Sequence, residues 1–351
     1  MPDRATTPDG ELRFPAAMLE ERAFSALREA GADEASAGAA TRAMMHASRL
    51  GIDSHGVRLT SFYAEALRSR QVNGTPSLAV RRTGAATATL DADHGLGHVA
   101  AYAGMEEACR IARESGIGAV GIARSTHYGA AGAYALAGAE RDFIGISTTN
   151  ADALVALHGG TTRFHGTNPI AAAAPVAGAR PWLLDMATSS IPYNRILLFR
   201  SLKRDLPADV TADLAGAPTC DPHAAEMLMP LGGRDFGFKG AGLAGLVTIL
   251  SAILTGATPD PFVPPMNPED GSPPRPHDIG HFCLAIDPER FVGRQGYEAL
   301  MAQYLASLRS APSLSGEPLL APGDREWQVM EERERDGIPL DPDTARFLAL
   351  A

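Results

Sequence analysis

Apolar residues recur at two different spacings along the chain, and the spacing changes twice. Up to about residue 76 they recur every three to four positions, which predicts helices over 18–30, 33–50 and 59–70. Between about residues 77 and 290, short apolar runs typical of strands alternate with alanine-rich helical stretches. From residue 291 onward the helical spacing returns. We therefore expect two helical terminal segments around a central stretch that contains a sheet.

The central stretch predicts an α/β fold, because strands that alternate with helices form a sheet covered by helices. A strand or a hairpin is expected at 80–90, and further strands at 118–122, 143–148, 170–176, 182–186 and 281–286. Further helices are expected at 99–114, 130–140, 243–257, 295–310 and 326–336. We expect an N-terminal helical segment at 1–76, a sheet-containing domain at 77–290, and a C-terminal segment at 291–351 that packs with the first. The proline- and acid-rich stretch 259–276 predicts an exposed loop.

Charge and composition narrow the range of partners. The 351 residues carry 31 Lys and Arg against 41 Asp and Glu, a formal net charge of −10, and no basic run is longer than a dipeptide. A nucleic-acid partner is therefore not expected, and an anionic ligand would need local positive groups.

The sequence also limits the cellular locations that are expected for the protein. The longest apolar stretch, 243–257, is shorter than the roughly 20 residues that cross a bilayer, so we expect a buried core helix and no membrane. The N-terminus has no apolar signal core, and the three cysteines are widely spaced and odd in number. These features favour a cytoplasmic protein.

Two glycine strings match the fingerprint of a dinucleotide-binding turn. The string at 95–100 lies between an expected strand and an expected helix, as that turn requires, whereas the string at 116–121 leads into a strand. The strand after the first string ends in Arg124-Ser125, without the acid that would bind a ribose. A standard Rossmann site is therefore not favoured.

Two histidines stand in short polar clusters where predicted elements end. In 53–58, His55 lies three residues before Arg58, which places an imidazole that can move a proton beside a guanidinium that can hold a carboxylate. In 125–132, His127 lies at a strand-to-helix turn, where glycines and alanines leave room for a ligand near the helix N-terminus. A helix-capping turn with a surface arginine, or a histidine that only caps the helix, accounts for the same residues.

Three further clusters carry polar groups at strand and helix ends. Thr167 and Asn168 supply side-chain hydrogen bonds, although Asn-Pro also suits a plain turn into a strand. Asp185 ends an apolar strand, where a carboxylate can fix the tautomer of an imidazole or merely cap a helix. Lys239, flanked by glycines, can direct its ammonium at phosphate or carboxylate oxygens, or lie on the surface.

Metal binding and hydrolysis are the competing interpretations of these clusters. His94 and His98 are four apart, but the glycines between them disfavour a helix and no acid or cysteine lies at ligand spacing, so no metal is expected. Ser54, His127 and Asp185 are the residue types of a hydrolase triad, but the chain lacks a Gly-x-Ser-x-Gly elbow, so a hydrolase is not favoured.

Six strings in register resemble the type 2 malate/L-lactate dehydrogenase family, which also contains ureidoglycolate, sulfolactate and diketogulonate oxidoreductases and a cyclic-imine reductase. They are GIDSHGVR, STHYGAAGAYA, FHGTNPIAAAAP, LLDMATSS, PLGG with GFKGAGLAGLVTILSAILTGA, and GHFCLAID. The resemblance implies a homodimeric oxidoreductase that uses NAD or NADP to interconvert a small, anionic 2-hydroxy acid and its 2-oxo acid. It also implies a mixed sheet flanked by helices, distinct from the Rossmann fold.

The resemblance, taken with the clusters above, assigns roles to individual residues. His127 becomes the leading proton donor and acceptor and His55 the second candidate, with Asp185 supporting the histidine or the cofactor ribose. Arg58, Thr167 and Asn168 are expected at the substrate. The expected cofactor contacts are Ala131, Ser189, Ser190, Ile191, Lys239, Gly323 and Asp324.

The chain departs from the family pattern at two places that concern the substrate. Relatives often have a polar pair after the strand that ends at Asn150, where this chain has Ala151-Asp152. The segment SSIPYNR replaces a common glycine-lysine step, and GFKG replaces the usual GGYKG. The reaction class is expected to hold, while a cyclic imine acid remains an alternative substrate and a hydrolase-like or binding protein the alternative class.

Overall fold

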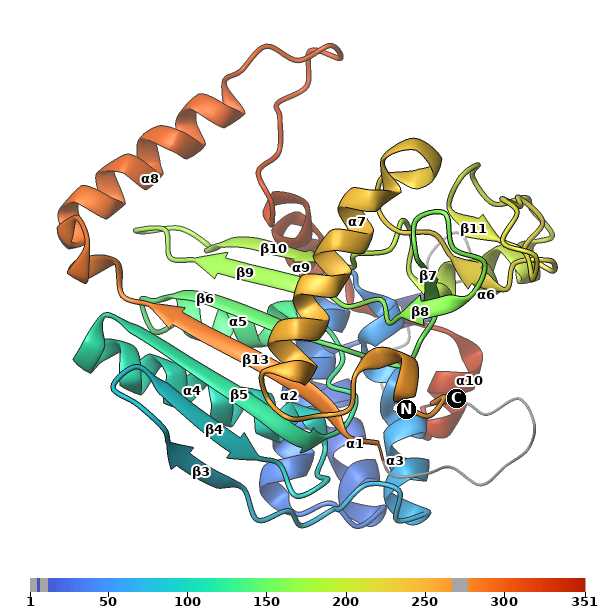
Figure 1. Ribbon diagram of the computed structural model, residues 1–351, viewed down its shortest axis with the longest axis horizontal. Coiled ribbons are helices and arrows are strands. Elements are labelled where there is room, and N and C mark those ends of the chain that lie inside the picture. Colours follow the sequence, from blue (N-terminus) through green and yellow to red (C-terminus); the bar gives the residue numbers. More distant parts are fainter. Residues whose placement is uncertain (1–4, 7–11, 267–276, 351) are drawn as a thin grey trace.

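The computed structural model describes residues 5–6, 12–266 and 277–350 (Figure 1). At its centre is a seven-stranded sheet with the strand order β10-β9-β6-β13-β5-β4-β3. Strands β4 and β5 are parallel and the other neighbouring pairs are antiparallel, so the sheet is mixed, as expected. Its strands are β3 (Ala79–Arg82), β4 (Thr87–Asp91), β5 (Ile117–Ser125), β6 (Ile144–Thr149), β9 (Ile170–Ala174), β10 (Trp182–Met186) and β13 (Ile279–Ile286).

One face of the sheet is covered by two helices, α4 (Gly97–Ser115) and α5 (Gly132–Ala139). Helix α4 packs on β5 and β13, and α5 packs on β6 and β9. Alternate strand residues such as Ala171 and Ala173 are fully buried on this side, which follows from the two-residue period of a strand. The other face is crossed by α7 (Gly233–Thr248), which continues into one π-helical turn, η3 (Ile249–Ile253).

The two ends of the chain meet in a helical lobe beside the sheet. Strand β14 pairs with β2 near the N-terminus, and its Ile338 shares a core with Leu19 and Leu27 of α1. Helix α8 (Gly293–Arg309) lies apart from this lobe (Figure 1). The expected domain boundaries at residues 76 and 290 stay predictions. The other elements of the lobe are α1 (Ala16–Glu29), α2 (Glu34–Arg49), η1 (Asp53–His55), η2 (Val57–Leu59), α3 (Thr60–Arg68), α9 (Asp324–Asp336), α10 (Pro342–Phe347), β1 (Ala5–Thr6), β2 (Leu12–Phe14) and β14 (Ile338–Leu340).

A second, four-stranded sheet lies beside the first, and the hydrophobic pattern did not predict it. Its order is β11-β12-β7-β8, and its strands have two or three residues each, too few for a recognisable alternation. Buried Val155, Ile196 and Leu228 form its core with α6. These elements are β7 (Val155–Ala156), β8 (Arg163–His165), α6 (Tyr193–Leu202), β11 (Thr211–Ala212) and β12 (Met227–Leu228); two short 3-10 turns, η4 (Asp260–Phe262) and η5 (Pro288–Arg290), flank β13.

Helix α7 with η3 is the apolar helix expected from the sequence, but within one chain it is only half buried. Small residues such as Ala244, Ser251 and Ala252 face the sheet. Ile249 and Ile253, two of the large residues expected in the core, are 52% and 62% exposed. Within the described residues, this is the one helix long and apolar enough to cross a membrane. Its large side chains instead form an apolar surface.

The glycine string at 95–100 does open a helix after a strand, but the helix N-terminus has no room for a phosphate. The backbone N–H of Gly97 donates to Oγ1 of Thr126 at 3.1 Å, and that hydroxyl donates to the carbonyl of Gly95. A Cβ at position 97 would lie 2.2 Å from the carbonyl oxygen of Thr126. The glycine is thus required for close backbone packing, and the string is not a dinucleotide site.

Candidate active site

A cavity of about 880 Å³ opens between the helical lobe, the edge of the main sheet and the small sheet. Its wall includes residues from η1, the segment after β5, the segment after β6, the end of β10 and the start of α9. The stretch 259–276, expected to be an exposed loop, contributes Pro261, Val263 and Met266 to this wall, while 267–276 lie outside the described residues. Asp260 of that stretch is fully buried. The expectation of an exposed loop is therefore wrong for the described part, since its turn packs on β8.

His127 lies in the cavity wall just after β5. Its Nδ1 is 2.7 Å from the hydroxyl of Tyr63 on α3, so one ring nitrogen is held by the helical lobe. The hydroxyl of Tyr63 stays protonated because burial raises its pKa far above the ordinary value. This contact leaves Nε2 as the ring nitrogen for a ligand in the cavity. Tyr63 could not be recognised from the sequence, because its position in a helix suits a core residue equally well.

His55 lies next to His127, with ring centroids 5.9 Å apart and the planes inclined by 25°. Its Nδ1 is 2.9 Å from Oγ of Ser54. The two histidines expected from separate clusters are thus brought together. The hydrolase triad drawn from Ser54, His127 and Asp185 is not formed, since Ser54 contacts His55 and Tyr63 holds Nδ1 of His127.

Burial keeps both imidazoles neutral. Loss of hydration lowers the pKa of His127 well below its usual value, and the neighbouring histidines, His55 first among them, lower it further. Burial, and then the charge of Arg58, lowers the pKa of His55 to about 4. At neutral pH the site therefore offers a neutral base rather than an imidazolium, in contrast to the protonated form that reduction of an oxo acid requires.

Asp185 also lines the cavity, at the end of β10, but its contact is with a helix rather than with a histidine. Its Oδ2 accepts the backbone N–H of Gly132 at 2.8 Å, at the N-terminus of α5. Burial raises the pKa of Asp185 to about 6 in spite of this hydrogen bond. Ala131, the preceding residue, shares the wall. Of the two roles expected for Asp185, contact with a ligand is the one that this position allows.

Of the three residues expected at the substrate, one lines the cavity and two do not. Thr167 lines the cavity, whereas Arg58 on η2 is exposed and lies outside its wall. Asn168 is fully buried behind the wall, where its amide donates to Asp260 Oδ2 at 2.6 Å. The same carboxylate oxygen accepts from His165, Thr248 and the backbone of Gly166. Asn168 thus belongs to a network that joins β8, α7 and η4.

The residues expected at the cofactor are divided in the same way. Gly323 is in the wall, at the N-cap of α9, while Asp324 pairs with Arg309 at 2.7 Å. The Ser189 hydroxyl donates to the carbonyl of Ile191, and Ser190 donates to that of Pro230. Lys239 is exposed on α7, over the rings of Phe236 and Phe238. Contacts of Ser189, Ser190, Ile191, Lys239 and Asp324 with a cofactor stay predictions.

Comparison with known proteins places the chain in a family. The model of the malate/L-lactate dehydrogenase family matches residues 14–349. The malate dehydrogenase of Pyrococcus horikoshii is 36% identical over 94% of this chain and 91% of its own length. The NAD(+)-dependent ureidoglycolate dehydrogenase of Escherichia coli K12 is 30% identical over 92% and 90%.

A solved structure agrees with these relatives. The malate dehydrogenase of Entamoeba histolytica superposes with a TM-score of 0.89 over 96% of both chains, at 28% identity. The chain belongs to the malate/L-lactate dehydrogenase family. This confirms the predicted family, the predicted mixed α/β fold and the predicted enzyme class, an NAD(P)-dependent 2-hydroxy-acid dehydrogenase.

Proposed function

We propose that the protein transfers hydride between NAD or NADP and a small 2-hydroxy acid, with His127 as the proton-transfer residue. The observation that carries this proposal is the neutral His127 in the cavity wall, with Nδ1 held by Tyr63 and Nε2 left for a ligand. A neutral imidazole is the form that accepts the proton of a 2-hydroxyl group as its carbon is oxidised. The bound nicotinamide supplies the hydride acceptor for oxidation and the hydride donor for reduction.

The proton follows a short route through residues of this chain. In oxidation, the substrate hydroxyl donates its proton to Nε2 of His127 while the carbon loses hydride. Tyr63 accepts a hydrogen bond from the Nδ1–H of His127 both before and after this transfer, because a neutral imidazole that accepts a proton at Nε2 carries its own proton on Nδ1. In reduction the imidazolium returns the proton to the oxygen. Since burial disfavours the imidazolium, the anionic substrate must stabilise it during this step.

The cavity has room and chemistry for the cofactor. At about 880 Å³ it is far larger than a four-carbon acid needs. Its lining includes Gly129, Ala130, Ala131 and Gly323, which carry no side chain larger than a methyl group and leave space for a flat ring. Asp185 also lines the cavity, next to Ala131 at the start of α5, and can accept hydrogen bonds from ribose hydroxyls. We propose Ala131, Asp185 and Gly323 as cofactor contacts.

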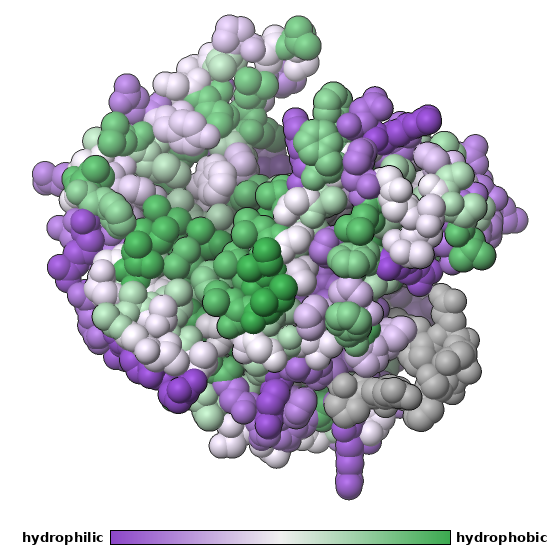
Figure 2. Space-filling model, viewed as in Figure 1, coloured by the Kyte–Doolittle hydropathy of each residue, from purple (hydrophilic) through white to green (hydrophobic). Residues whose placement is uncertain are grey.

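We further propose that two copies associate through the uncovered face of the main sheet. Ile144, Ile146 and Leu284 on this face are partly exposed, and Ile249 and Ile253 of η3 lie next to it. Figure 2 shows the apolar area at the centre of this side, over α7 and the adjoining strands. Stable homodimers bury apolar surfaces of this kind.

The unpaired cysteines Cys109, Cys220 and Cys283 support a reducing compartment, and we propose the cytoplasm.

Mass measurement in solution tests the association. Light scattering on the purified chain is expected to give the mass of a dimer, and Ile253→Asp is expected to give a monomer. Leu214→Asp is the matched control, because Leu214 is also a large aliphatic side chain, 81% exposed, but lies in the turn after β11 and not on the proposed surface. A monomeric parent chain, or a dimer that persists in Ile253→Asp, would contradict the proposed surface.

Cofactor binding followed by a substrate panel tests the activity. NADH or NADPH is expected to raise the melting temperature of the protein and to change its own fluorescence on mixing. A panel of 2-hydroxy, 2-oxo and cyclic imine acids, followed by nicotinamide absorbance, then identifies the substrate. No response to either dinucleotide would refute the dehydrogenase.

A further inference from the structure

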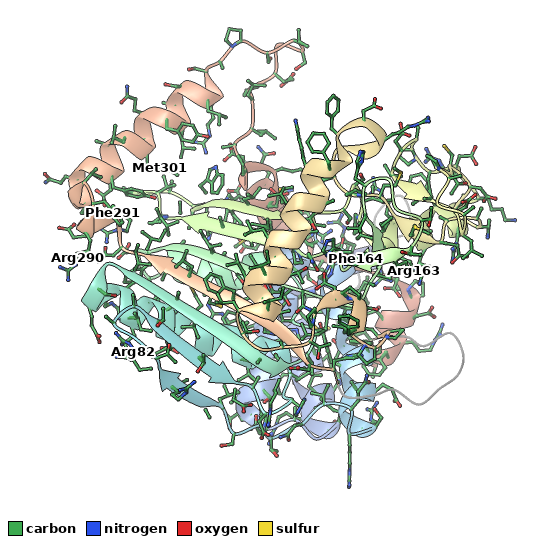
Figure 3. The ribbon with its side chains drawn as sticks, in the orientation of Figure 1. Arg82, Arg163, Phe164, Arg290, Phe291 and Met301 are labelled. Carbon is green, nitrogen blue, oxygen red and sulfur yellow. The ribbon has the colours of Figure 1, made fainter. Side chains whose placement is uncertain are left out.

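The charges in the cavity wall are unusual for an enzyme whose substrate is an acid. Among the described residues, the wall holds three carboxylates, Asp152, Asp185 and Glu326, and one guanidinium, that of Arg163. Arg163 lies on β8 (Figure 3) and is already engaged, since its Nε donates to the carbonyl of Glu226 at 2.6 Å and its NH2 lies 3.2 Å from the Glu226 carboxylate. The wall therefore offers more acceptors than donors.

Asp152 is the carboxylate whose position bears on the substrate. It lies in the segment between β6 and β7, and the preceding residues Thr149, Asn150 and Ala151 line the same cavity. Asp152 is 8% exposed, and within the described residues its side chain accepts one hydrogen bond, from the backbone N–H of Met266 at 3.2 Å. No ion pair of Asp152 occurs in that part of the chain.

The same region of the cavity borders the proton-transfer histidine. His127 follows β5 and Asp152 follows β6, and both strands run antiparallel to β13 between them, so the two residues extend from the same edge of the sheet into one cavity. Burial raises the pKa of Asp152, although His277 and Arg163 act in the opposite direction. Asn150 does not offset the charge, because its amide donates to the carbonyl of Thr258 and its oxygen accepts from the N–H of Gly280.

We propose that Asp152 determines the substrate class: a 2-hydroxy or 2-oxo acid with one carboxylate and a tail that ends in a hydrogen-bond-donating nitrogen. An amide or ammonium group on the tail donates to Asp152. A second carboxylate or a sulfonate at the same place meets a like charge, and Arg163, the one guanidinium in the described wall, is already paired with Glu226. This inference rests on the proposed dehydrogenase activity and excludes a second anionic group of the kind that malate carries.

Three probes that differ only in the tail test the proposal: lactate, malate and the 4-amide of malate. The amide and malate are nearly isosteric, so charge and hydrogen-bond donation are the differences between them. Because a hydrogen bond to a charged group is lost with malate and a repulsion is gained, we expect kcat/KM for the amide to exceed that for malate by about tenfold or more. Lactate has no such tail and reports the basal reaction.

Two variants show whether Asp152 causes the preference. Asp152→Asn removes the charge with little change of shape, and is expected to raise kcat/KM for malate about tenfold and to lower it for the amide. Glu29→Gln, an exposed acid at the end of α1, makes the same change of net charge outside the cavity and is expected to leave the ratio unchanged. The melting temperature of the enzyme–cofactor complex with each acid gives a readout independent of turnover.

The outcomes separate the two proposals. The role of Asp152 would be overturned by any of three results. Malate is turned over or bound as well as its amide, Asp152→Asn leaves the ratio of the two kcat/KM values unchanged, or neither acid is turned over or changes the melting temperature. Turnover of lactate under those conditions would leave the dehydrogenase standing. Failure to bind NADH and NADPH would instead overturn the dehydrogenase itself.

Discussion

Replacement of Tyr63 by phenylalanine tests how His127 is held. The substitution removes the hydroxyl that lies 2.7 Å from Nδ1 and leaves that buried nitrogen without its partner. An unpaired buried polar group costs about 1–3 kcal/mol, and about 1.4 kcal/mol corresponds to a factor of ten. If this loss falls on the transition state, where His127 carries a charge, kcat decreases about 10- to 100-fold. Binding of the dinucleotide is expected to stay near the parent value, because Tyr63 is outside the cavity wall.

The assay is the initial rate of change in nicotinamide absorbance at saturating cofactor and substrate, with dinucleotide affinity measured by fluorescence. Tyr134→Phe is the matched control: it also removes a buried tyrosine hydroxyl, which donates to the carbonyl of Tyr128 and has no contact with His127. It is expected to lower the melting temperature and to leave kcat of the folded enzyme unchanged. A Tyr63→Phe enzyme that is folded and keeps kcat within about twofold would refute this reasoning.

Two further predictions concern stability. Six histidines are held neutral with lowered pKa values, so the unfolded state takes up more protons below pH 6.5 and the free energy of unfolding falls there by up to about 1.4 kcal/mol per pH unit for each. Asp152 and Asp185, with their raised pKa values, oppose this decrease. A melting temperature that does not fall between pH 7 and 5 would contradict the burial of the six histidines. Asp260→Asn is expected to lower the free energy of unfolding in urea by about 3 kcal/mol, because four donors converge on that carboxylate. The control Glu29→Gln is expected to change it very little. An equal effect of the two substitutions would refute the network. The six histidines are His46, His55, His98, His127, His277 and His281.

The strands of the main sheet and the long helices could be predicted from the sequence because the apolar residues in them recur with a regular period over a long run. Strand β10 was expected at the residues it occupies, and α4 and α8 within two residues of their ends. The four-stranded sheet did not follow, because pairs of two-residue strands are fixed by contacts such as those of Val155 and Leu228 rather than by local pattern. The half-burial of α7 was missed for a related reason: helical spacing of apolar residues does not show which molecule buries them.

The candidate site was predictable where polar residues follow apolar strands, and not where the partner comes from elsewhere in the chain. His55 and His127 stood out by their glycine-rich surroundings and do meet in the structure. Tyr63 carries no local signal, and Asp152 stands out only as part of the Ala151-Asp152 departure from the family pattern, which does not show that its side chain lines the cavity. Asn168 is the opposite case, a polar residue in a conspicuous turn that does not reach the cavity. Its side chain instead binds Asp260.

The most direct test of the central claim is the effect of His127→Ala on turnover measured together with dinucleotide affinity. General acid–base catalysis contributes roughly 10²–10⁴ in rate, so kcat on the identified substrate is expected to fall by that factor while the affinity for NADH or NADPH changes little. Near-full activity in the His127→Ala enzyme would contradict the assignment of the proton to His127.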